Sequence, residues 1–202
     1  MTKFQKIAVV FLALALSATA AFGASVVVNF DNLNNGDVIT NQYAGVTFSS
    51  TSGNVNYVTT QPQYLSTPPN FLCSGPASGG IDCAQETFLN FSSPVNGLNF
   101  DGMGVNDIGV EAQIDVWTNG VFNSTVQVIG NAQGLAPDHI DLSGFSNVTE
   151  IRIYNIVDGG GIGWDTFQYT QGQGTTPEPG TLIMFGSGII GLAGMLRRKI
   201  NL

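Results

Sequence analysis

The chain has 202 residues, of which 14 are acidic and six are basic, and its formal net charge is −8. The imbalance is greater between residues 24 and 176, where 13 acidic side chains accompany the single Arg152, giving a net charge of −12. A field of this sign repels nucleic acid and anionic lipid, so the composition excludes a nucleic-acid-binding protein, while it suits both divalent cations and a merely soluble acidic surface.

The N-terminus has the pattern of a secretory signal peptide. Lys3 and Lys6 precede an apolar run over residues 7–16, and small residues then lead to Ala21-Phe22-Gly23. A basic region, an apolar region and a small-residue cleavage site in this order predict export. We therefore expect a signal peptide over residues 1–23, with an uncleaved anchor as the alternative.

Residues 24–171 have the signals of one all-β domain. Short segments rich in β-branched and aromatic residues alternate with Gly, Asn and Pro, and no stretch has a helical period. The expected strands are Ser25–Phe30, Val46–Ser50, Val55–Thr59, Thr87–Ser92, Val110–Thr118, Val121–Ile129, Val148–Ile156 and Ile162–Thr170. About eight strands in one domain predict a two-sheet β-sandwich of jelly-roll type, with an immunoglobulin-like sandwich as the alternative.

Two local features add detail to this domain. Asn119-Gly120 separates two of the expected strands and predicts a tight β-hairpin. Cys73 and Cys83, the only cysteines, stand ten residues apart in a segment rich in Gly, Ser and Pro. In an exported protein they predict one disulfide that closes this loop, because no second metal-ligand pair or activating base accompanies them.

Candidates for catalysis are few. His139 is the sole histidine, and the chain has no Gly-x-Ser-x-Gly motif or phosphate-binding loop. Glu86, Glu111 and Glu150 are the available acids for glycoside hydrolysis, but the sequence does not give the distances between their carboxyl groups in the folded protein. We therefore predict that the protein is not an enzyme.

Binding is the activity class that the aromatic residues favour. Tyr43, Trp117 and Trp164 are candidates for stacking on the apolar faces of sugar rings. The alternative is that Trp117 and Trp164 belong to the core, where aromatic side chains dominate sandwich packing.

The C-terminal segment differs in composition from everything before it. Residues 172–180 form a Gly/Thr/Pro linker that contains Pro177, Glu178 and Pro179, and residues 181–196 have no charge. Arg197, Arg198 and Lys199 follow at once. Sixteen helical residues span about 24 Å, somewhat less than a hydrocarbon core of about 30 Å. Residues 181–202 therefore predict a transmembrane helix with its basic end in the cytoplasm.

This tail resembles a PEP-CTERM sorting segment, which combines a Pro-Glu-Pro motif, a transmembrane stretch and a short basic end. The resemblance covers about the last 26 residues. It implies anchoring in the inner membrane of a Gram-negative bacterium and processing near the motif by an exosortase, a membrane-embedded Cys protease-transpeptidase. Members of this family are associated with extracellular polysaccharide, so the implied destination is the cell surface, outer membrane or extracellular matrix.

A second resemblance concerns the two ends of the β domain. The opening "VNFDNLNNGDVITNQYAGVTFSS" and the closing "GGGIGWDTFQY" resemble the first and last strands of exported carbohydrate-binding jelly rolls. In those domains the two segments are neighbours and frequently enclose a structural calcium ion. The resemblance implies a calcium site at Asp31 and Asp165, with two ordinary turn aspartates as the alternative.

Three functions follow as hypotheses. The first is an exported, non-enzymatic protein of the cell surface or of an exopolysaccharide matrix such as a biofilm. The second is a carbohydrate-binding module, and the third is a secreted hydrolase. An exposed row of aromatic side chains on one sheet face would favour the second, and two facing carboxylates about 5 to 10 Å apart would favour the third.

Overall fold

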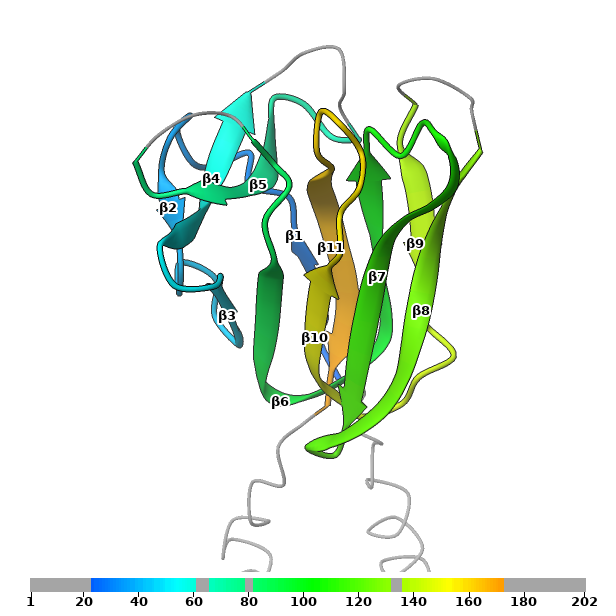
Figure 1. The fold of residues 1–202 in the computed structure, drawn as a ribbon. Coiled ribbons are helices and arrows are strands. Elements are labelled where there is room, and N and C mark those ends of the chain that lie inside the picture. The colour runs from blue at the N-terminus through cyan, green and yellow to red at the C-terminus, as the bar shows by residue number, and fades with distance from the viewer. Residues whose placement is uncertain (1–22, 61–65, 79–81, 132–135, 173–202) are drawn as a thin grey trace, which may run out of the picture. The chain divides into compact units, whose positions relative to one another are not determined.

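The computed structural model describes residues 23–60, 66–78, 82–131 and 136–172 (Figure 1). The chain divides into two compact units, Met1–Gly172 and Gln173–Leu202. Within the described ranges every regular element is a strand, and no described helix could cross a membrane. The predicted signal peptide, the Pro-Glu-Pro linker and the transmembrane tail lie almost wholly outside these ranges.

Eleven strands in the described part of the chain pair with one another, and every pairing among them is antiparallel. They are β1 (Ser25–Val28), β2 (Val38–Ile39), β3 (Val46–Ser49), β4 (Asn54–Thr60), β5 (Asn70–Pro76), β6 (Thr87–Met103), β7 (Ile108–Thr118), β8 (Val121–Asn131), β9 (Asp138–Asp141), β10 (Val148–Tyr154) and β11 (Gly163–Gln171).

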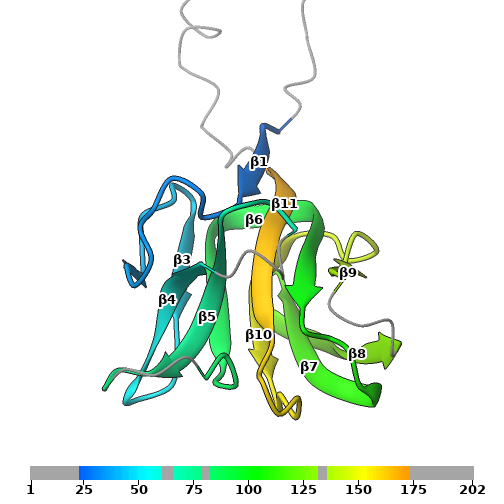
Figure 2. The ribbon, with the colours of Figure 1, turned by 90° about the horizontal axis from the view of Figure 1, so that it is seen from above.

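Strand β6 joins the two layers of the fold. Its first part pairs with β3 and β10, and its second part pairs with β9 and β11. We call β3, β6, β10, β7 and β8 the front sheet, and β9, β6, β11, β1, β5, β4 and β2 the back sheet. Figures 1 and 2 show β10 and β7 on the opposite side of the molecule from β1 and β11. The predicted all-β sandwich is thereby confirmed.

The bend in β6 has a visible cause in the sequence. Val148 of β10 faces Val95, whereas Glu150, two residues later, faces Asn90. The pairing therefore advances five residues along β6 for two residues along β10. The excess lies around Pro94, which cannot donate to a sheet ladder and is tolerated at such irregularities. The chain turns there from one sheet into the other.

The core fills the space between the sheets with alternating side chains. Ile114, Val116, Ile151 and Ile153 of the front sheet are buried, and they face a back sheet rich in aromatic residues. Phe100 stacks on Phe167 with ring centroids 4.7 Å apart. All buried apolar residues of the described chain fall between Val28 and Tyr169, so the sandwich contains the whole of its own core.

The predicted hairpin and disulfide are both confirmed. Asn119 and Gly120 have φ values of 52° and 77°, as the tight turn between β7 and β8 requires. Cys73 and Cys83 are bonded and buried in a small second core with Phe71 and Met103. The bridge does not lie in a free loop, however, because Cys73 is part of β5.

The two ends of the sandwich are neighbours. Ser25 of β1 faces Thr170 of β11, and the N–H of Gln171 donates to the carbonyl of Ala24 at 3.1 Å. Residues about 145 positions apart in the chain thus close the back sheet together.

Candidate functional site

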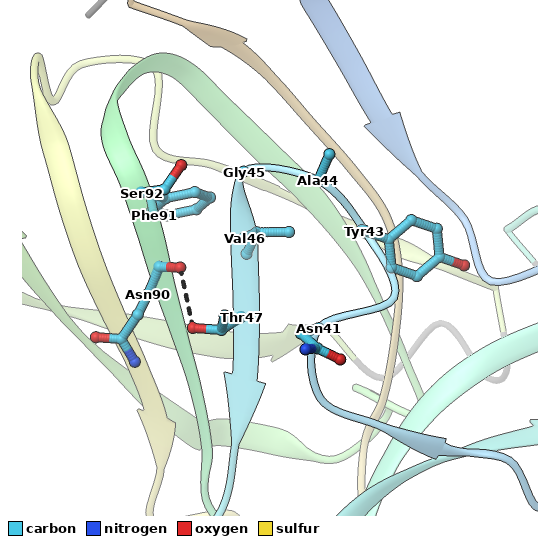
Figure 3. A pocket seen from close by; sticks show the side chains of 9 residues that line it. All are labelled: Asn41, Tyr43, Ala44, Gly45, Val46, Thr47, Asn90, Phe91 and Ser92. Carbon is cyan, nitrogen blue, oxygen red and sulfur yellow. Dashed lines mark hydrogen bonds between the residues drawn. The ribbon is translucent and has the colours of Figure 1, made fainter.

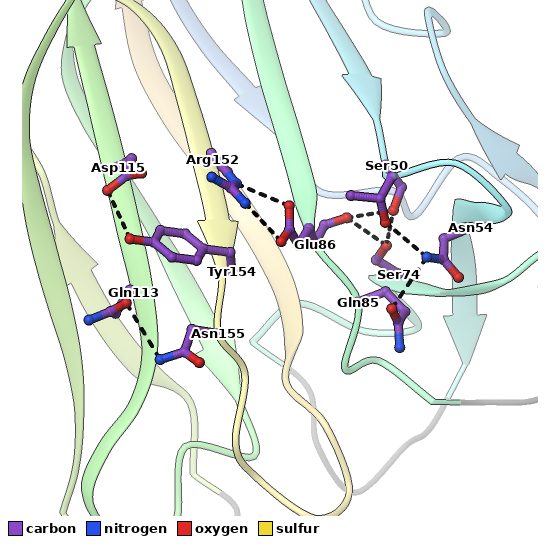
Figure 4. Close-up of polar contacts among 11 residues, drawn as sticks. Ser50, Asn54, Ser74, Gln85, Glu86, Gln113, Asp115, Arg152, Tyr154 and Asn155 are labelled. Atoms are coloured by element: carbon purple, nitrogen blue, oxygen red, sulfur yellow. Dashed lines mark hydrogen bonds and ion pairs between the residues drawn. The ribbon is translucent and has the colours of Figure 1, made fainter.

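The outer face of the front sheet carries a cluster of charged and aromatic side chains. Alternation along β10 buries Ile151 and Ile153 and turns Arg152 and Tyr154 outward. Arg152 lies opposite Phe88 of β6 on one side and Asp115 of β7 on the other. We call Glu86, Phe88, Asp115, Arg152 and Tyr154 the Arg152 cluster, and Figure 4 labels its members Glu86, Asp115, Arg152 and Tyr154.

The Arg152 cluster is held rigidly by paired contacts. Arg152 donates through Nε and Nη2 to the two carboxylate oxygens of Glu86 at 3.0 and 2.9 Å. Its guanidinium carbon lies 4.4 Å from the centroid of the Tyr154 ring and 5.7 Å from that of Phe88. The hydroxyl of Tyr154 donates to Asp115 at 3.2 Å. The hydrogen bonds to Glu86 raise the pKa of Arg152, so the charge is permanent but fully paired.

A second line of side chains crosses the same face. Strand register places Thr47 opposite Asn90, Asn90 opposite Glu150, and Glu150 opposite Trp117. We call these four residues the cross-sheet row. Trp117 is partly exposed and packs edge-on against Phe122 of β8, with centroids 5.6 Å apart. Trp117 therefore keeps part of its ring exposed on this face, and its stacking role stays a prediction.

The cross-sheet row begins beside a hollow of about 300 Å³ next to β3. Asn41, Tyr43, Thr47, Asn90 and Phe91 are among its lining residues, and Thr47 donates to the carbonyl of Asn90 at 3.4 Å. Figure 3 shows Tyr43 on one side of β3 and Asn90 and Phe91 on the other. The hollow and the row together present amides, hydroxyls and aromatic rings.

The Tyr43 ring is fixed beside this hollow. Its hydroxyl donates to Asn32 at 2.8 Å, and its ring packs edge-on against Phe30 with centroids 5.6 Å apart. Burial raises the pKa of Tyr43 to about 12, so the hydroxyl stays protonated. Tyr43 is half-buried, and part of its surface remains available for contact.

The predicted stacking role of Trp164 is wrong. Trp164 has no exposed surface and packs against Phe100 with centroids 5.8 Å apart. It belongs to β11, an interior strand of the back sheet, and both its neighbours in the strand, Gly163 and Asp165, are buried as well. The alternative of a core tryptophan, which the sequence left open, is the one that the structure adopts.

Asp31 lies shortly after β1 and Asp165 belongs to β11, and these first and last strands pair, as the resemblance implied. Asp165 is fully buried, and its carboxylate accepts hydrogen bonds from the N–H and hydroxyl of Thr67 and from the N–H of Thr166, at 2.7 to 2.9 Å. Burial nevertheless dominates and raises the pKa of Asp165 to about 6.

The backbone beside both aspartates is strained. Phe30 and Thr166 have φ values of 59° and 52°, in the left-handed region that bulky and β-branched residues avoid. Each such residue costs of order 1–3 kcal/mol, and such residues cluster at functional sites. The strain marks this junction as a candidate site.

The same junction lacks a ready set of calcium ligands. Calcium takes six to eight oxygens, whereas the Asp31 carboxylate already accepts from Asn29 Nδ2 at 2.6 Å and from the N–H of Asn70 at 3.2 Å. Within the described ranges, no group of three or more His, Cys, Asp and Glu side chains could hold a metal ion. The calcium site stays a prediction.

His139 contacts an acid rather than a nucleophile. Its Nδ1 lies 2.9 Å from Asp101 Oδ1, and the hydroxyl of Ser66 donates to the other oxygen of Asp101. The carboxylate thus stands between the hydroxyl and the imidazole. In hydrolytic triads the imidazole stands between the other two groups and accepts the hydroxyl proton, which this order of contacts does not provide.

The three candidate acids have separate roles in the structure. Glu86 is paired with Arg152, Glu111 is buried beneath the connection between β6 and β7, and Glu150 lies in the cross-sheet row. The Arg152 cluster was not predicted from the sequence, because Glu86 and Arg152 are 66 residues apart. No sequence motif links two residues at this separation, and the register of β6 and β10 brings them together.

Comparison with known proteins adds two findings. Residues 175–199 match the family described as the PEP-CTERM protein-sorting motif, and no curated protein matches the chain. The chain therefore carries the predicted sorting motif at Pro177, Glu178 and Pro179, and it is an exported protein sorted by an exosortase.

The described domain is also similar to solved structures at low identity. These include the K2 and K1 cleaved adhesin domains of Lys-gingipain, the latter from Porphyromonas gingivalis W83, with TM-scores of 0.45 and 0.44 and identities of 14% and 13%. Each match covers 74% of this chain and 99% of the adhesin domain. A third is CBM86, a low-affinity xylan-binding module from Roseburia intestinalis, with a TM-score of 0.31, 13% identity and coverage of 74% and 96%.

Proposed function

We propose that this exported protein is a non-enzymatic component of the cell surface or extracellular matrix that binds polysaccharide across its front sheet. The observation that supports the proposal best is the cross-sheet row, which leads from the hollow at Tyr43 to Trp117. Sugar rings bind by stacking an apolar face on an aromatic plane while amides and hydroxyls fix their orientation. A free-standing carbohydrate-binding module is the alternative form of the same proposal.

The Arg152 cluster makes this surface rigid, and the charges of the domain decide which ligands it prefers. Binding is stronger when the contacting side chains are already ordered, and the paired contacts of Arg152 and Tyr154 supply that order. Arg152 is the only basic side chain of residues 24–176 apart from His139, and Glu86 neutralises it. The excess of acids repels an anionic chain, so the expected ligand is a neutral polysaccharide.

The binding test uses residues 24–172, which contain their own core. Polysaccharide extracted from the producing host, neutral xylan and acidic alginate are titrated against the domain by calorimetry. We expect binding to a neutral polymer, and we expect Trp117→Ala to weaken it about tenfold, or about 1.4 kcal/mol. Tyr57→Ala, which removes a half-buried aromatic ring of the back sheet, is the matched control. Equal binding by Trp117→Ala and the parent would reject the proposed surface.

Sorting makes up the second part of the proposal. Before processing, the protein is anchored in the inner membrane by residues 181–202, and Arg197, Arg198 and Lys199 hold its C-terminus in the cytoplasm. Glu178→Ala should trap or mislocalise the protein while the sandwich stays folded. Cell fractionation decides this, and unchanged surface delivery of the variant would contradict it.

Calcium at Asp31 and Asp165 enters the proposal as a structural ion. A ligand at a hundredfold excess over its Kd stabilises a native state by about 2.7 kcal/mol. Thermal unfolding with calcium, with magnesium and with neither, repeated on Asp31→Asn and Asp165→Asn, tests the site. A melting temperature that is the same with and without calcium would contradict the proposed calcium site.

A further inference from the structure

One edge of the sandwich differs from all the others in length. Strands β1, β2, β3 and β9 have two to four residues each, and each pairs with a single described strand. Strand β8 has 11 residues and, in the part of the chain that the structure describes, pairs only with β7. Figure 1 shows it at the margin of the front sheet. Short edge strands limit unwanted pairing, and β8 lacks this protection.

Strand β8 also lacks the residues that usually guard an edge. Its sequence, VFNSTVQVIGN, has no proline, no lysine and no other charged residue. Val121, Phe122 and Ile129 are 68%, 51% and 54% exposed, near its two ends. Natural edge strands avoid pairing with another chain by means of charges, prolines or bulges that twist the edge away. Strand β8 has one extra residue relative to β7, at Asn123 near its start, and residues 124–131 continue without another. This uncharged stretch of the edge is suited to receive a partner strand.

The side chains of β8 are compatible with a second copy of the same strand as the partner. Two copies of a domain with a net charge of −12 repel each other wherever their acids meet, so the contact requires an edge without exposed acids. Two acids of β7 lie against β8: Asp115 accepts hydrogen bonds from Thr125 and Tyr154, and Glu111 is buried beside Gly130. The uncharged centre of β8, with Thr125 and Gln127, lets a second identical strand approach without like-charge contacts. Cross-strand threonine and amide pairs favour such a ladder.

We propose that β8 pairs antiparallel with β8 of a second copy of this chain and joins the two front sheets into one continuous sheet. The two-fold arrangement is self-complementary and closes at two copies, because each β8 has one free edge. It satisfies the free backbone N–H and C=O groups of β8 and covers Val121 and Ile129 at the ends of the strand. This inference does not depend on polysaccharide binding, since it rests on the edge of the sheet rather than on its face.

The first test measures the mass of residues 24–172 in solution. Sedimentation equilibrium over a range of concentrations should show a reversible dimer. Gln127→Lys and Gln127→Glu should each weaken it at least tenfold, because either charge is desolvated in the ladder. Gln168→Lys and Gln168→Glu are the controls, since Gln168 is equally an exposed glutamine but lies in β11, between β1 and β6. Melting temperatures verify that all four variants fold.

The second test locates the contact. Under mild oxidation, Thr125→Cys, near the centre of β8, should form a disulfide between two copies, because opposite residues in an antiparallel ladder lie within disulfide reach. Thr47→Cys, on the short edge strand β3, should not. A parent domain that is monomeric at all concentrations overturns the proposal. A dimer that both Gln127 variants leave intact and Thr125→Cys fails to cross-link overturns it as well.

Discussion

Glu111 gives the structure its sharpest energetic prediction. It is 1% exposed near the start of β7, and its Oε2 accepts the N–H of Asn106 at 3.1 Å, whereas its Oε1 is buried without a hydrogen-bond partner. A Cβ at Gly130 would lie 1.7 Å from that Oε1 and 2.1 Å from the carbonyl oxygen of Asp107. Two acceptor oxygens thus lie close together, which is a costly arrangement inside a protein. Burial raises the pKa of Glu111 more than the backbone N–H groups of Asp107 and Asn106 lower it.

We predict that Glu111→Gln stabilises the domain at neutral pH. Glutamine has nearly the same shape, its oxygen can keep the bond from Asn106, and its amide can donate to the carbonyl of Asp107. A buried acceptor without a partner costs about 1–3 kcal/mol, and the gain should be of this size. The change also removes the repulsion that Glu111 experiences from Asp107 and Asp158.

The pH dependence of this gain follows from the direction of the pKa shift. Burial raises the pKa of Glu111, so folding favours the protonated acid. The parent then has its full stability below the ordinary pKa of 4.5 and loses stability as the pH rises through the folded-state value. The advantage of Glu111→Gln should therefore be large at pH 7.5 and absent at pH 3.5.

Urea unfolding of residues 24–172 at both pH values measures this difference. Glu150→Gln, which neutralises a half-buried acid of the cross-sheet row, controls for the loss of one negative charge. If Glu111→Gln is no more stable than the parent at pH 7.5, or keeps the same advantage at pH 3.5, the reasoning from the unpartnered oxygen fails.

Three further predictions test other parts of the fold. Gly130→Ala should destabilise the domain by about 1–3 kcal/mol in urea, because the new methyl group meets a backbone carbonyl as well as Glu111. Replacing Cys73 and Cys83 by serine should cost about 2–4 kcal/mol by thermal unfolding, and an unchanged melting temperature would show that the bridge adds nothing. In metal-free buffer, stability should fall as the pH rises from about 4 through about 6, because burial raises the pKa of Asp165 from 3.8 to about 6 and favours its neutral form. Asp165→Asn should lose less stability over this pH range than the parent. An equal loss would show that Asp165 does not cause the pH dependence.

The sequence predicted those strands whose side chains alternate clearly. Residues Val121–Ile129 became β8 with two more residues, and the Asn119-Gly120 turn fell where expected. Strand β5 was missed because Asn70–Pro76 contains Asn, Gly and Pro, which have low strand propensity. Its strand conformation comes from pairing with β4 over seven residues, a long-range effect that local composition does not reveal.

The extent of β6 was missed for a different reason. Thr87–Ser92 was predicted as a strand, but Pro94 and Gly97 suggest a turn, and the strand in fact continues to Met103. Here the proline marks the bend between two sheets rather than the end of the element. The candidate binding surface depends on the same bend, because it decides that Asn90 faces outward in the front sheet while Phe100 is buried in the core.

The pairing of β1 with β11 has a consequence for how the protein is made. A ribosome delivers the chain from its N-terminus, and β1 finds no partner among the described strands until residues 167–170 follow. Until then, the core also lacks Trp164, Phe167 and Tyr169, three of its largest side chains. A chain that ends before residue 167 therefore leaves β1 unpaired among the described strands and cannot close the sandwich. The domain can complete its fold only when the residues just before the sorting motif, which begins at residue 175, are present.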